Sequence, residues 1–128
     1  VRFANSLPAD LAELAIILTG AHWRAQFEFW AHARAAARAG VSDAVIEAIR
    51  TGSRPTLEGS ASTVYDFATE LLQKQRVSDG TYARALEAFG EQGVVDLVGT
   101  VGYYSLVSMT LNTFEVPLPE GETPPFTE

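Results

Sequence analysis

The stretch FEFWAHARAAARAGVSDAVIEAI, residues 27–49, decides the fold. Its first part is rich in alanine and arginine, which favour a helix, and Gly40 is a typical helix end. Ser42 then caps a short second helix that reaches Arg50, with Asp43 in its first turn. Strand signals are weak and helix signals are strong along the rest of the chain as well, so the sequence predicts an all-α fold.

Helical periodicity and breaks extend this pattern along the chain. We expect a single-domain bundle of about six helices, with a loop at 51–59. In the fifth helix, Tyr82, Ala85, Leu86 and Phe89 should point inward. The helical domain spans 1–115, and 116–128 is a proline-rich tail that should lie extended on the surface or over a neighbouring subunit. The expected helices cover residues 8–20, 22–39, 42–50, 60–75, 78–90 and 92–114.

Composition excludes several classes of function. Sixteen acidic and nine basic residues give a net charge of −7, which argues against nucleic acid or a membrane as partner. The uncharged stretch 97–114 contains too many polar residues for a lipid-exposed span, so we expect a helix of a soluble protein that is buried in its core or in a subunit interface.

The chain has no cysteine, which excludes disulfides and thiol chemistry and suits the cytoplasm. No apolar run follows Arg2, so no signal peptide is predicted. Because Val1 is not a methionine, upstream residues can be missing from this numbering.

Residues 22–32 hold both histidines and both tryptophans of the chain. On a helix, Glu28 and His32 are four residues apart and lie side by side, with alanines around them. A carboxylate beside an imidazole is an acid–base unit that works near neutral pH. The same pair is also typical of a modest helix-stabilising contact, and the sequence leaves both interpretations open.

A metal site built from His22, Glu28 and His32 is the third interpretation. On a continuous helix His22 lies about 120° from Glu28, and the spacing differs from HExxH. We therefore expect no metal.

Residues 27–49 resemble the core motif of the carboxymuconolactone decarboxylase family, whose superfamily includes the AhpD-like alkylhydroperoxidases. In that motif a histidine precedes a glycine by eight residues, as His32 precedes Gly40, and Val-Ser and a short helix follow. The resemblance extends in outline over most of the chain, including the helix at 92–114. It implies an AhpD-like fold and assembly as a homo-oligomer, a trimer or a hexamer.

The resemblance also separates two chemistries. The peroxidase branch carries a CxxC pair where this chain has Ala25 and Glu28, so a thiol peroxidase is excluded. The decarboxylase branch resembles this chain in having a glutamate four residues before the histidine. It implies that Glu28 and His32 handle protons in a carboxy-lyase or isomerase that acts on a small carboxylate without a cofactor. No full set of substrate-binding residues matches.

Five further residues are candidates for substrate binding. Arg24 could anchor a carboxylate, although a solvated arginine is the more common case. Tyr104, Ser108 and Asn112 form a polar stripe on the last helix, in which Ser108 fits a structural role better. His22 and the pocket wall Trp30 complete the set. A non-enzymatic ligand-binding or oligomeric module on the same fold remains the alternative.

Overall fold

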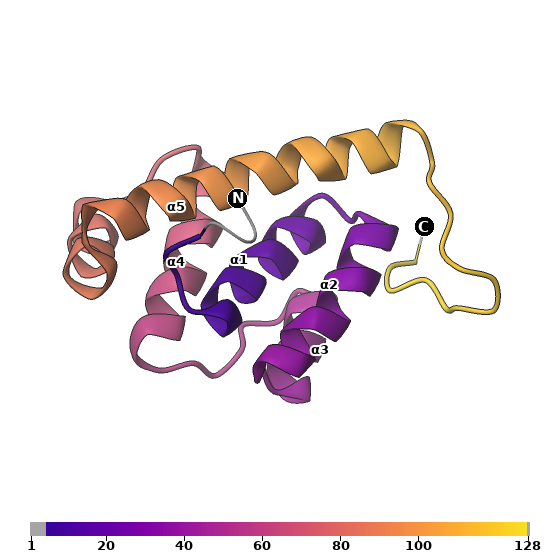
Figure 1. Cartoon of the computed structure of the whole chain (residues 1–128), viewed down its shortest axis with the longest axis horizontal. Coiled ribbons are helices and arrows are strands. Elements are labelled where there is room, and N and C mark those ends of the chain that lie inside the picture. The colour runs from indigo at the N-terminus through magenta and orange to yellow at the C-terminus, as the bar shows by residue number, and fades with distance from the viewer. Residues whose placement is uncertain (1–4, 128) are drawn as a thin grey trace.

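The computed structural model describes residues 5–127 and is built from helices alone in that range (Figure 1). The sequence-based expectations about Val1 and Arg2 lie outside the described residues. The all-α prediction is confirmed, but the helices number five and not six. They are α1 (Ala9–His22), α2 (Gln26–Ala39), α3 (Asp43–Thr51), α4 (Gly59–Lys74) and α5 (Asp79–Thr113).

The helix count differs because the last two expected helices are continuous. Gly90 has φ 71° and ψ 179°, a backbone conformation outside the helical region that puts a kink inside α5. Glycine adopts positive φ without steric cost, so the chain changes direction there without a loop. The sequence located this break correctly, and only the number of separate helices differs.

The predicted helix ends around α2 and α3 are confirmed. Gly40 ends α2 in the left-handed conformation with φ 109°. Ser42 caps α3 by accepting a hydrogen bond from the backbone N–H of Val45. Ser78 caps α5 in the same way through Thr81. These caps satisfy N–H groups that have no partner within the helix.

The expected helix at 22–39 begins four residues late. His22 is the last residue of α1, and α2 starts at Gln26. Between them Arg24 has φ 50°, which is uncommon for a residue with a side chain and marks a tight turn. Because of this turn, the two histidines belong to different helices.

The hydrophobic core surrounds α1, whose residues 11–20 are all buried. This helix packs against α2, α4 and α5 and lies in the middle of the molecule in Figure 1. A helix that is apolar on all sides is typical of such a central position. The largest core side chains that other helices contribute are Phe29 from α2, Phe67 from α4 and Leu97 from α5.

The outer face of α5 is exposed, which corrects two expectations. Tyr82 and Leu86 were expected to point inward, but they are 48% and 37% exposed. The stretch 97–114 was expected to be buried, but only its inner face is. Val98 and Leu106, on the outer side of this stretch, are 49% and 56% exposed. In the described part of the chain, α5 is long and apolar enough to cross a membrane by length and composition, and 33% of that window is buried.

The proline-rich tail folds back along α2 (Figure 1). Phe126 is buried and its ring packs against Phe29. The Gln26 amide donates to the Phe126 carbonyl over 2.7 Å and accepts from the Phe126 N–H over 3.0 Å. Arg50 donates to the Pro125 carbonyl over 2.8 Å. The tail thus lies on the surface of its own chain.

Candidate active site

Three helices bring together a buried group of polar side chains. Glu13 comes from α1, Glu28 and His32 from α2, and Ser108 from α5. Both glutamates and Ser108 are buried in an otherwise apolar interior. Carboxylates are rarely buried unless they are paired, so such a group is a candidate for function.

His32 forms its polar contact with Glu13. The Nδ1 atom of His32 lies 2.8 Å from Oε1 of Glu13, and both side chains are largely buried. An ionised carboxylate can only accept, so beside an ionised Glu13 a neutral His32 ring carries its hydrogen on Nδ1 and keeps the lone pair on Nε2. The carboxylate that orients the ring is therefore Glu13, whereas the sequence suggested Glu28.

Glu28 forms a different hydrogen bond. It is 2% exposed, and Ser108 donates its hydroxyl hydrogen to Oε2. The other oxygen, Oε1, is buried and has no hydrogen-bond partner within the described residues. A buried polar atom without a partner is rare and requires an explanation.

Burial raises the pKa of Glu28 from 4.5 to about 7, because desolvation penalises the charged form. The hydrogen bond from Ser108 and the nearby His32 both act against this rise. His32 thus influences Glu28 electrostatically, as two residues four apart on one helix face should. Glu28 can hold or release a proton at neutral pH, as an acid–base catalyst must.

Tyr104 and Ser108 are the residues of the predicted polar stripe that reach this group. The Tyr104 ring is buried and lies edge-on to the His32 ring, with 5.2 Å between the centroids. We expected a structural role for Ser108. Its side chain is buried, but its hydroxyl donates to Glu28, whose pKa is about 7, so it also contacts a candidate catalytic group. Asn112 lies apart, where its amide donates to the Trp23 carbonyl over 2.8 Å.

The other predicted substrate-binding residues lie elsewhere. Arg24 donates to the carbonyl of Thr127 and stacks over Phe126. Trp30 donates to Oε1 of Glu122 over 2.9 Å. Both side chains therefore contact the tail.

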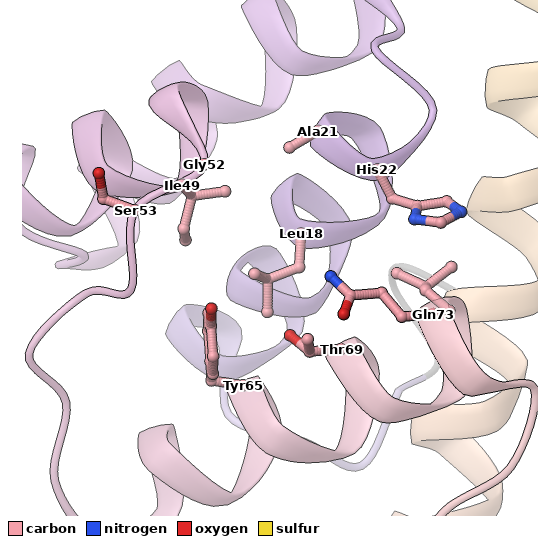
Figure 2. Close-up of a pocket in the computed structure, with 10 residues that line it drawn as sticks. Leu18, Ala21, His22, Ile49, Gly52, Ser53, Tyr65, Thr69 and Gln73 are labelled. Carbon is pink, nitrogen blue, oxygen red and sulfur yellow. The ribbon is translucent and has the colours of Figure 1, made fainter.

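His22 ends α1 and lines a separate pocket (Figure 2). Glu28 and His32 do not line this pocket. Within residues 5–127, no three His, Asp or Glu side chains gather as a metal site requires.

Glu13 is the site residue that the sequence reasoning missed. A signal was present, since Glu13 is the only charged residue in the apolar run 11–18. A single charge in the middle of a buried helix indicates a buried partner. Finding that partner required the packing of α1 against α2.

Searches among protein-family models, curated proteins and solved structures find no match to this chain.

Proposed function

We propose that this chain is a carboxymuconolactone decarboxylase-like enzyme of AhpD-like fold. It catalyses the decarboxylation or isomerisation of a small oxo- or lactone-carboxylate by acid–base chemistry, without a cofactor. The observation that carries the proposal is Glu28, a buried carboxyl with a pKa of about 7 and one oxygen without a partner.

The two proton-handling groups have complementary roles. Glu28 holds a proton near neutral pH and delivers it to a carbanion or enolate. His32, held by Glu13 through Nδ1, offers Nε2 as the group that accepts a proton. Two groups in different environments on one helix can thus serve as acid and base.

In a decarboxylation, the bond between the carboxylate and the neighbouring carbon breaks, and its electron pair moves into the adjacent carbonyl system. Carbon dioxide leaves, and the proton from Glu28 ends on the carbon. In an isomerisation, His32 removes a proton from one carbon and Glu28 adds one at another. Both reactions conserve electrons, so neither requires an oxidant or a reductant.

The alternative function is a non-enzymatic ligand-binding or oligomeric module. The observation that favours it is the exposed outer face of α5, since exposed apolar faces often mark protein interfaces. Assembly of a homo-oligomer through this face is compatible with either function.

The enzyme would convert a substrate, whereas the non-enzymatic module would only bind a ligand or another copy of the chain. A panel of small oxo- and lactone-carboxylates, followed by proton NMR in heavy water, should show deuterium entering the carbon next to the carbonyl. Glu28→Gln and His32→Asn should each lower this rate by about 100-fold or more. His22→Asn is the matched control, because His22 lies on another helix, and it should retain the wild-type rate. If no substrate reacts, or if Glu28→Gln and His32→Asn leave the rate unchanged, the module is the correct interpretation.

A further inference from the structure

The pocket beside His22 lies between α1, α3 and α4 and has a volume of about 180 Å³ (Figure 2). Leu18, Ile49 and Leu72 form its apolar surface. The turn after α3 and one face of α4 supply polar side chains, and His22 stands at the end of α1. The pocket wall therefore combines apolar and polar side chains in similar proportion.

Three polar side chains of α4 line this pocket and have unused hydrogen-bonding capacity. They are the hydroxyls of Tyr65 and Thr69 and the amide of Gln73. No protein group within residues 5–127 forms a hydrogen bond with any of these three side chains. The hydroxyls and the amide can each donate and accept. They can therefore recognise a ligand that carries both a donor and an acceptor.

The pocket wall carries no formal charge at neutral pH. Its lining contains no aspartate, glutamate, lysine or arginine. Partial burial lowers the pKa of His22 below its ordinary value of 6.5, which leaves the imidazole neutral. A charged ligand would leave water here without meeting a countercharge, which is unfavourable.

The volume of the pocket suits a ligand of one ring. An apolar cavity of about 150 Å³ holds a benzene molecule. The present volume of about 180 Å³ leaves room for a ring with one polar substituent.

We propose that this pocket binds an uncharged, single-ring molecule through the Tyr65 and Thr69 hydroxyls and the Gln73 amide. His22 and Glu13 are nine residues apart on α1, which places them about 180° apart around the helix and about 13 Å apart along it. The pocket is therefore a different site from the Glu13–His32 group. The proposal does not depend on the proposed enzymatic function.

Benzamide is a suitable probe, because it is an uncharged ring that carries an amide donor and acceptor. In a titration followed by ¹H–¹⁵N NMR, it should shift the amide signals of 18–22, 49–53 and 65–73 with a Kd of about 1 mM. Benzoate has the same size and carries a charge, so it should bind about tenfold more weakly or worse.

Paired variants test whether the named hydroxyls bind the probe. Tyr65→Phe with Thr69→Val should weaken benzamide binding by about tenfold, the effect of losing two hydrogen bonds. Tyr103→Phe with Thr110→Val removes the same groups from the exposed face of α5 and should leave binding unchanged. The dispersion of the NMR spectrum shows that each variant is folded.

Three results would overturn the proposal. The first is the absence of saturable shifts with benzamide. The second is equal binding of benzoate. The third is an unchanged affinity in the folded Tyr65→Phe and Thr69→Val protein.

Discussion

His32 of α2 and Glu13 of α1 form a buried polar contact, with 2.8 Å between Nδ1 and Oε1. Glu28, one turn before His32, turns instead to Ser108 of α5. The two proton-handling groups therefore have separate partners on separate helices. Glu28 can therefore keep its proton while a different side chain, Glu13, holds the imidazole of His32.

The contact with Glu13 predicts the tautomer of His32. In the wild type, the hydrogen should reside on Nδ1 when the ring is neutral, because an ionised carboxylate accepts only. Glu13→Leu removes the acceptor and should shift the population toward the Nε2–H form. The ¹⁵N chemical shifts of the two ring nitrogens measure this, and His22 serves as an internal control. Unchanged His32 signals in Glu13→Leu would refute the contact.

Glu28 should make stability depend on pH. The unfolded chain ionises this carboxyl near pH 4.5, whereas the folded protein keeps the proton until about pH 7. Its contribution to the free energy of unfolding is therefore fully present below pH 4.5, declines between these values and is lost above pH 7. The loss amounts to about 3 kcal/mol.

Glu28→Gln should lack this component, because an amide does not titrate. Urea unfolding of both proteins at pH 5 and pH 8 gives the comparison. The wild type should lose stability relative to Glu28→Gln as the pH rises. Parallel pH profiles would show that Glu28 titrates alike in the folded and unfolded states.

The fold was largely predictable from local signals, since Gly40, Ser42 and Ser78 act within a few residues of themselves. The turn at Arg24 was not, because no glycine marks its positive φ. The orientation of Tyr82 and Leu86 was wrong because periodicity identifies an apolar face but not the partner that covers it.

The site was predictable only where its residues lie close together in the sequence. Spacing on one helix placed Glu28 beside His32, whereas the partners Glu13 and Ser108 are 19 and 80 residues away in sequence. Of the five candidates for substrate binding, only Tyr104 lies against His32, whereas Arg24 and Asn112 line a different pocket beside the tail. Such long-range contacts leave little trace in a single sequence.

The tail should contribute to stability through Phe126. Phe126→Ala removes a ring that is 5% exposed and packs on Phe29, and it should lower the free energy of unfolding by about 3 kcal/mol. Phe114→Ala is the matched control, because that ring is 75% exposed, and it should cost less than about 0.5 kcal/mol. Chemical denaturation measures both, and equal effects would contradict the docking of the tail.

The exposed face of α5 should hold copies of the chain together if the protein is a homo-oligomer. Leu106→Asp places a charge on this face and should reduce the mass measured by light scattering. Ala88→Asp lies before the kink, is also exposed and should leave the mass unchanged. An assembly that survives Leu106→Asp would have to use another surface.

The central claim is that Glu28 carries a transferable proton at neutral pH. Carbon-13 NMR of the side-chain carboxyls, with Glu28 assigned through Glu28→Gln, follows its titration directly. The structure predicts a midpoint of about pH 7. Ser108→Ala should move that midpoint upward by about one pH unit, because the lost hydrogen bond favours the ionised form. A midpoint near 4.5, unchanged by Ser108→Ala, would show that Glu28 is an ordinary ionised carboxylate and would contradict the proposed acid–base site.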